Sequence, residues 1–171
     1  MPFAVTHVLA SIILVDLYRD YFTKHKKYFT IHTLFIAGLG GLLPDIDIPL
    51  NIVTTKIGLE VAHRGITHTP LFALLILIPG LVLWKFRHHK KAVYFFVISF
   101  GIFTHMFLDA FFIFNVQTDG IMVLYPLSDM RFGLKTLWTQ SRIEGGVALD
   151  AIILLLWLWW EERRHKIKDF I

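Results

Sequence analysis

The stretch 92-AVYFFVISFGIFTHMFLDAFFIF-114 decides the class of this protein. It is almost entirely apolar and long enough to cross the hydrocarbon core of a bilayer, which requires about 20 such residues. It nevertheless contains His105 and Asp109. Ionisable side chains at membrane depth are costly and usually functional. The stretch therefore predicts a membrane-spanning helix that carries part of a functional site.

Four more apolar segments lie around it, at Pro2–Leu17, Phe29–Leu43, Pro70–Phe86 and Gly145–Trp160. The chain has 171 residues, of which 56% are hydrophobic, and a mean hydropathy of +0.61. This apolar content exceeds that of a typical soluble domain. Several segments are short for a full span, so re-entrant helices remain an alternative. We predict one domain, residues 1–171, folded as an all-α polytopic membrane bundle of about five transmembrane or partly re-entrant helices.

The basic residues indicate an orientation. With five spans, one side of the membrane carries twelve of the 17 Lys and Arg residues: Arg19, Lys24, Lys26, Lys27, Lys85, Arg87, Lys90, Lys91, Arg163, Arg164, Lys166 and Lys168. The positive-inside rule then places the N-terminus outside and the C-terminus in the cytoplasm. The net charge of +4 is explained by this topology, and we expect no nucleic-acid partner.

Potential ligands gather on the other, outer side. It holds four of the nine histidines, namely His7, His63, His68 and His105. It also holds eight of the 13 acidic residues, namely Asp45, Asp47, Glu60, Asp109, Asp119, Asp129, Glu144 and Asp150. Because the topology was derived from Lys and Arg alone, this clustering is an independent observation, and it predicts a site at the external face.

Two pairs of side chains stand out. His105 and Asp109 are four residues apart, so they share one face of a helix. Asp45 and Asp47 follow the second apolar segment, where Pro44 makes continuation of the helix unfavourable. Acidic residues at a helix C-terminus are not explained by the helix dipole. We interpret both pairs as site residues; the alternatives are a structural polar network for the first and a solvated helix end for the second.

The segment His63–Pro70, with the sequence HRGITHTP, precedes the third apolar segment. Thr69 is a suitable N-cap and Pro70 a suitable first helical residue. Gly65 permits a tight turn between the two histidines. Arg64 offers a planar guanidinium that suits a phosphate or carboxylate. A plain polar loop is the alternative reading.

Two further ionisable residues lie inside apolar segments. His7 is one to two turns into the first segment and Asp150 about one and a half turns into the fifth, both on the outer half. Buried ionisable groups in a membrane need partners. We therefore include His7 among the candidate ligands and keep Asp150 as an open candidate.

The candidate ligands are imidazoles and carboxylates. The chain has no cysteine, which excludes disulfides and thiolate ligands. This set suits zinc, and also manganese or iron. One or two ions would favour hydrolysis of a phosphoester, with Arg64 stabilising charge on the phosphoryl group. The position at the outer leaflet predicts a phospholipid or lipid-linked phosphate as substrate.

Several motifs in order resemble the prokaryotic membrane-bound metal-dependent hydrolase family. They are Thr6-His7, Gly-Leu-Leu-Pro-Asp-Ile-Asp at 41–47, His-Arg-Gly-Ile-Thr-His-Thr at 63–69, His-x-x-x-Asp at 105–109 and Tyr-Pro-Leu-Ser at 125–128. That family is distantly similar to the zinc-dependent phospholipase C and single-strand nuclease superfamily. The resemblance implies metal ligands at His7, Asp45 or Asp47, His63 or His68, His105 and Asp109.

The chain departs from the zinc enzymes in one respect, because it has no second His-x-x-x-Asp motif. Only Asp119, Glu144 and Asp150 remain as late acidic candidates, so one or two ions are expected rather than three. We assign Asp47, Arg64 and His68 to catalysis.

The sequence thus predicts a membrane-embedded metal-dependent hydrolase, with two rivals. A transporter or ion-binding membrane protein needs a polar path across the full depth. The inner halves of the fourth and fifth segments are apolar, which disfavours it. A non-catalytic, metal-stabilised membrane scaffold would use the same ligands, and the sequence does not separate it from an enzyme.

Overall fold

The computed structural model describes residues 4–23, 28–59, 63–111 and 120–133, with Ile153, Leu154, Leu156, Trp157 and Trp160. Its α-helices are α1 (Ala4–Tyr21), α2 (Ile31–Leu42), α3 (Asp47–Thr54), α4 (Pro70–Lys85) and α5 (His89–Phe111). Three 3-10 turns complete the helical elements: η2 (Leu43–Ile46), η3 (Thr55–Ile57) and η4 (Ile66–His68). In the described part of the chain, β-pairing is limited to one isolated bridge between Ile121 and Phe132. The predicted all-α class is confirmed, whereas the fifth apolar segment lies largely outside the described residues.

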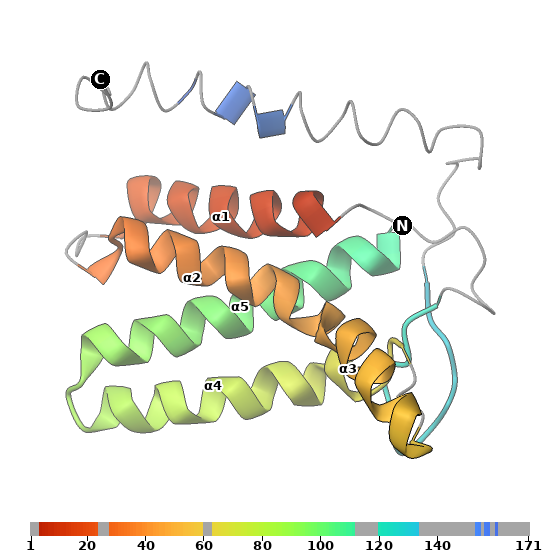
Figure 1. Ribbon diagram of the computed structural model, residues 1–171. Coiled ribbons are helices and arrows are strands. Elements are labelled where there is room, and N and C mark those ends of the chain that lie inside the picture. Colours follow the sequence, from red (N-terminus) through yellow and green to blue (C-terminus); the bar gives the residue numbers. More distant parts are fainter. Residues whose placement is uncertain are drawn as a thin grey trace.

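Helices α1, α2, α4 and α5 run alongside one another (Figure 1). Helix α2 packs between α1 and α5, and α5 packs against α4. Successive helices alternate in direction, so the start of α1, the end of α2, the start of α4 and the end of α5 meet at one end of the bundle (Figure 1). The segments that carry the candidate ligands are thereby brought together.

Glycines allow α1, α2 and α5 to approach closely. A Cβ on Gly40 would lie 2.7 Å from the carbonyl oxygen of Ile98, and one on Gly101 would lie 2.6 Å from the backbone nitrogen of Gly41. A Cβ on Gly41 would lie 2.5 Å from the carbonyl oxygen of His7. Only a residue without a Cβ fits such contacts. Backbone therefore touches backbone directly beside the candidate ligands.

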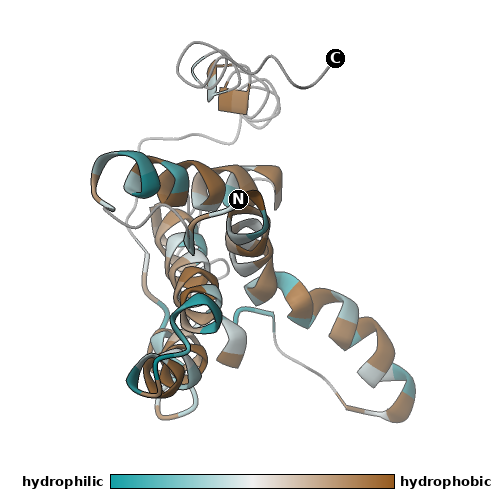
Figure 2. Cartoon of the chain, turned by 90° about the vertical axis from the view of Figure 1, so that its left-hand side faces the viewer, coloured by the Kyte–Doolittle hydropathy of each residue, from teal (hydrophilic) through white to brown (hydrophobic). Residues whose placement is uncertain are grey.

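The second apolar segment does not end as expected. Helix α2 stops at Leu42, one residue from the predicted boundary, but Pro44 does not send the chain out of the helical path. Proline occupies the first turn of η2, where its missing N–H is tolerated, and the chain continues into α3. Helix α3 then diverges from the bundle (Figure 2).

The other predicted boundaries agree with the structure to within four residues. Thr69 caps α4, because its Oγ1 accepts a hydrogen bond from the Phe72 amide at 3.2 Å, and Pro70 opens the helix. Helix α5 begins three residues earlier than predicted and is helical up to Phe111, the last residue that the structure describes before residue 120.

Two helical stretches among the described residues, Ile31–Ile57 and His89–Phe111, are long and apolar enough to cross a membrane. Helix α4 is apolar but shorter. Its outward face exposes Leu74, Leu75, Ile78 and Leu81, each about half exposed. Apolar colouring accordingly covers much of the helical surface (Figure 2). A helix that is apolar on its outer face is suited to contact with lipid.

Candidate metal centre

The candidate ligands meet at one end of the bundle. Helix α1 contributes His7, η2 contributes Asp45, and α3 begins with Asp47. The turn before α4 contributes His63, Arg64 and His68, and α5 contributes His105 and Asp109. Six of these side chains are at most 2% exposed: His7, Asp47, Arg64, His68, His105 and Asp109. All eight predicted residues that the structure describes are therefore brought into one cluster.

Four atoms at its centre converge, and five of their six separations are close to those between ligands of one metal ion. His68 Nε2 and His105 Nε2 are 3.2 Å apart. Asp45 Oδ1 lies 3.6 and 3.5 Å from these two nitrogens. Asp109 Oδ2 lies 3.8 and 3.9 Å from them. Ligand atoms bound tetrahedrally to zinc at 2.0–2.1 Å are about 3.3–3.4 Å apart, so the arrangement needs adjustments of only a few tenths of an ångström.

His105 has a defined tautomer. Its Nδ1 lies 2.7 Å from the carbonyl oxygen of Gly41. Because a carbonyl only accepts, Nδ1 carries the hydrogen and Nε2 directs a lone pair into the centre. Such a hydrogen bond behind a histidine is the usual way in which a metal ligand is oriented. The close contact at Gly41 is what brings this carbonyl within reach.

His68 is oriented in the same way by Asp47. Thr67 donates its hydroxyl hydrogen to Asp47 Oδ2 at 3.0 Å, and His68 Nδ1 lies 3.1 Å from the hydroxyl oxygen. His68 Nδ1 also lies 3.4 Å from Asp47 Oδ2. His68 Nε2 therefore presents a lone pair opposite that of His105. Two lone pairs at this distance repel unless a cation or a proton lies between them.

The environment of His68 is consistent with a bound cation. Burial favours the neutral ring, but the carboxylates of Asp45 and Asp47 outweigh it and raise the pKa of His68 above its ordinary value. The electrostatic surroundings thus attract positive charge to this point.

Asp47 holds the site together. Its Oδ1 lies 2.9 Å from His63 Nδ1, and its Oδ2 accepts hydrogen bonds from the Arg64 amide at 2.9 Å and from Thr67. Both carboxylate oxygens are therefore used by protein groups, and they fasten the turn before α4 to the start of α3. Asp45, in contrast, directs one oxygen towards both Nε2 atoms.

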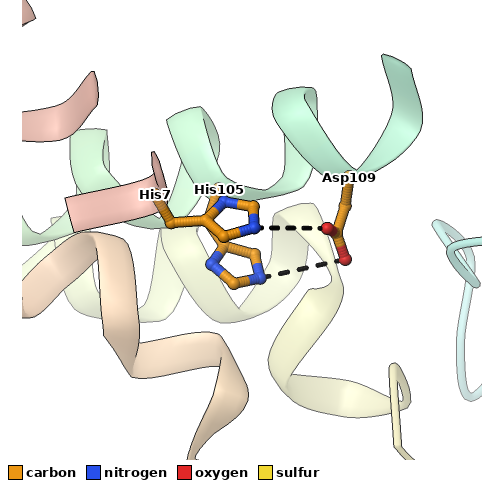
Figure 3. Close-up of side chains that lie close together, drawn as sticks. All are labelled: His7, His105 and Asp109. Carbon is orange, nitrogen blue, oxygen red and sulfur yellow. Dashed lines mark ion pairs between the residues drawn. The ribbon is translucent and has the colours of Figure 1, made fainter. Parts of the chain in front are cut away.

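Asp109 is surrounded by potential cations but is poorly satisfied. Arg64 Nη2 lies 3.0 Å from Oδ2, and His7 Nε2 lies 3.4 Å from Oδ1. His7 stacks on His105 with ring centroids 3.8 Å apart, and both rings direct a nitrogen towards Asp109 (Figure 3). Among the described residues, neither Asp109 oxygen has a hydrogen bond of good geometry, nor do His7 Nδ1 and Arg64 Nε. Unsatisfied buried polar atoms are costly, and a cation at the centre would relieve those of Asp109.

The turn that carries Arg64 is strained. Arg64 adopts φ of 62°, in the left-handed region, whereas Gly65 has φ of −79°. Gly65 lies in the predicted turn between the two histidines, but the residue with a positive φ there is Arg64. A non-glycine residue in this region costs about 1–3 kcal/mol. At Arg64 this cost is compensated, because the conformation lets one residue contact two carboxylates. Its amide bonds to Asp47 and its guanidinium faces Asp109.

The charges of the cluster leave room for one divalent ion. Two sets of three residues have ligand atoms within 4.8 Å of one another: His7, His105 and Asp109, and Asp45, His63 and His68. The distances across the centre join these sets into one. Its three carboxylates and one guanidinium sum to −2 when the histidines are neutral, which one divalent cation balances.

Some predicted residues lie outside this description, and two contributors were missed. Asp119, Glu144 and Asp150 fall outside the described residues. Sequence reasoning did not find Thr67 or the carbonyl of Gly41, although both lie within motifs that it singled out. The Tyr-Pro-Leu-Ser motif forms a turn, and its segment packs beside Ala110, next to Asp109.

Comparison with known proteins places this chain in a family. The model of the YdjM inner membrane protein family matches residues 1–167, so the chain belongs to that family. No curated protein and no solved structure matches the chain. The family description names a membrane location and no reaction, so the activity has to be argued from the chemistry of the site.

Proposed function

We propose that this protein is a membrane-embedded, metal-dependent phosphoesterase that acts on a phospholipid or lipid-linked phosphate at the external face of the inner membrane. One observation carries the proposal. The Nε2 atoms of His68 and His105 converge with oxygens of Asp45 and Asp109 at 3.2–3.9 Å, in a buried site with uncompensated negative charge.

His68, His105, Asp45 and Asp109 would hold the ion. Imidazole and carboxylate ligands in a tetrahedral arrangement favour zinc, with manganese or iron as alternatives. The charge balance favours one ion over two. A bound divalent ion supplies Lewis-acid charge and makes water a better nucleophile at neutral pH. His7 supports this set by contacting Asp109 and stacking on His105.

His63 is the residue that we propose for proton transfer. Asp47 holds its Nδ1 at 2.9 Å, and its side chain is 37% exposed, at the open edge of the cluster. A partly exposed histidine that is oriented by a carboxylate is suited to general acid–base catalysis. His68 then acts as a ligand and Asp47 as a positioning residue, which revises their expected catalytic roles.

Arg64 would bind the phosphate. Its guanidinium brings a fixed positive charge beside Asp109, and its Nε has no hydrogen bond among the described residues. A planar guanidinium with a free N–H matches an anionic phosphoryl oxygen. Arg64 therefore links the metal ligand Asp109 to the group that is hydrolysed.

The surroundings of the site favour a lipid substrate. Helix α3 and the turn before it expose Ile46, Ile52 and Val53 by 49–62%, directly after or beside the ligands of η2. A charged centre next to an apolar surface suits a molecule whose headgroup reaches the ligands while its tail stays in the bilayer. The basic residues on the opposite side support five spans with an external N-terminus.

Buried polar residues of α1 that lie further from the candidate metal centre are the main observation in favour of a transporter. Ser11 and Asp16 are at most 2% exposed. Both have partners within the same helix, because Ser11 donates to the His7 carbonyl at 2.9 Å and Asp16 forms an ion pair with Arg19 at 2.7 Å. Buried polar side chains whose partners lie in the same helix are better explained as structural than as part of an ion path. Hydrolysis therefore remains the better supported proposal.

Purified protein assayed with phospholipid and lipid-phosphate substrates tests this function. Hydrolysis should require the added divalent ion, and both His63→Gln and Arg64→Gln should lose most of the activity while retaining metal. Asp129→Asn, which alters an exposed acid away from the cluster, is the matched control. Metal-loaded protein that releases no phosphate from any such substrate, but equilibrates ions across vesicles, would favour the transporter instead.

A further inference from the structure

The end of the bundle opposite the metal centre contains a cavity of about 690 Å³. It lies between α1, α4, α5 and the residues that precede α2. Its volume is within the roughly 300–1,000 Å³ that is typical of small-molecule sites. The metal-centre residues do not line it, so it is a separate feature of the protein.

The lining of this cavity suits an apolar chain. Aromatic rings contribute much of it, from Tyr18, Phe22, Phe29, Trp84, Phe96 and Phe100. Val15, Val93 and Val97 add aliphatic surface. An occupant surrounded in this way gains by burying hydrocarbon and finds few groups to bind a polar molecule.

The cavity lies beside a basic turn. The connection from α4 to α5 places Lys85, Arg87, Lys90 and Lys91 at the surface, all exposed. Trp84, which lines the cavity, immediately precedes them. Figure 2 views the bundle from this end and shows the hydrophilic connection between the two helices.

His89 joins the basic turn to the cavity. Its ring packs edge-on against Trp84, with centroids 4.4 Å apart, and lies 6.3 Å from the ring of Tyr28. Both partners line the cavity. Arg87 adopts φ of 61°, so the turn is tight and its positive charges are held close together.

Acidic side chains on the neighbouring helix are fewer than the basic groups of the turn. Asp16 and Asp20 of α1 both pair with Arg19, at 2.7 and 3.2 Å. These three residues contribute a net charge of −1, against the four positive charges of the turn. In the part of the chain that the structure describes, an apolar cavity therefore lies beside a surplus of positive charge, which is complementary to a molecule with a hydrocarbon chain and an anionic head.

We propose that this cavity binds one acyl chain of an anionic phospholipid, whose headgroup lies on the basic turn between α4 and α5. Basic residues near an anionic membrane surface attract such lipids strongly. The cavity adds a place for the chain next to that charge. This site is independent of the metal centre and of its proposed activity.

Quenching of Trp84 fluorescence tests the proposal. The full chain is reconstituted into phosphatidylcholine vesicles that contain a minor fraction of phosphatidylglycerol with brominated acyl chains. The Trp84 signal is the difference between the wild type and Trp84→Phe. We expect brominated phosphatidylglycerol to quench this signal severalfold more than the same fraction of brominated phosphatidylcholine does.

Charge removal identifies the headgroup contact. A variant with Lys85, Arg87, Lys90 and Lys91 all changed to Gln should lose the preference for phosphatidylglycerol, whereas Lys56→Gln, at the other end of the bundle, should keep it. An unchanged circular dichroism spectrum and Tm in each variant show that the fold is intact. Equal quenching by both lipids would mean ordinary contact with bulk lipid, and no quenching would mean a cavity closed to lipid. Either result would overturn the proposal.

Discussion

His105 Nε2 lies 3.2 Å from His68 Nε2, and the other nitrogen of each ring has a protein partner. His105 is fixed by the Gly41 carbonyl and His68 by Thr67 and Asp47, so the two free nitrogens face each other. Two carboxylates, of Asp45 and Asp109, approach the same point. Facing lone pairs at this distance repel unless a cation or a proton lies between them, and the proposed metal ion would fill this position.

Metal should stabilise the fold. An ion that binds only the folded state adds about 2.7 kcal/mol when its concentration is 100 times its Kd. We therefore expect zinc to raise the Tm of the chelator-treated protein in detergent by several degrees. The Asp45→Asn variant should lose this response, because it removes a ligand at a half-buried position. A wild-type Tm that is the same with chelator and with zinc would contradict the site.

Asp47→Asn should weaken metal binding without removing a ligand. The Asp47 carboxylate accepts from the Arg64 amide and from Thr67 at Oδ2 and faces His63 Nδ1 at Oδ1, whereas an amide has only one accepting atom and cannot serve both sides. Loss of such support behind a ligand typically costs 10–100-fold in metal affinity. Titration with zinc measures the effect, with Asp129→Asn as control. An affinity equal to that of the wild type would show that Asp47 does not orient His68.

Gly101→Ala should disrupt the metal centre, although Gly101 is not one of its ligands. The added Cβ would lie 2.6 Å from the Gly41 nitrogen and 2.8 Å from the Ala37 oxygen, both backbone atoms that move only with their helix. Overpacking of this kind costs about 1–3 kcal/mol. We expect a lower Tm and weaker zinc binding, since α2 carries the carbonyl that orients His105.

Gly38→Ala is the milder counterpart of this change. Its Cβ would meet only side-chain atoms of Ile12 and Val8, at 3.1 Å or more, which can adjust. If it reduced zinc binding as much as Gly101→Ala, close packing beside Gly41 would not be the cause.

The pH dependence of stability should differ between the metal-free and metal-loaded forms. The pKa of His68 is raised above its ordinary value of 6.5 in the metal-free fold, so the stability that this shift provides is present below that value and is lost as pH rises through the raised pKa. Metal binding instead requires the neutral ring. The difference in Tm between the two forms should therefore widen with rising pH, as thermal unfolding at a series of pH values can show. A difference that stayed constant would exclude His68 as a ligand.

Much of the helical framework could be predicted because its signals are local. The Thr69–Pro70 pair fixed the start of α4, and the spacing of His105 and Asp109 placed both on one face of α5. The gathering of eight candidate residues at one end followed from the alternating helix directions. Such features depend on residue types and chain order, both of which the sequence contains.

Other features depend on contacts between distant segments. The sequence could not separate Asp45 from Asp47, because η2 turns one carboxylate to the centre and the other to residues 63–67. It also gave no sign that Arg64, beside Gly65, would adopt a positive φ. The positive φ of Arg64 makes sense only when its partners Asp47 and Asp109 are in place.

Metal content of the detergent-purified protein, measured by elemental mass spectrometry, tests the proposed centre most directly. Wild type and Asp129→Asn should each carry about one zinc or manganese ion per chain, as expected for a single site with four protein ligands. Asp45→Asn and His105→Gln should carry little, with folding checked by circular dichroism. Folded wild-type protein that holds no metal after incubation with each ion, or variants that retain the full amount, would contradict a metal centre at these residues.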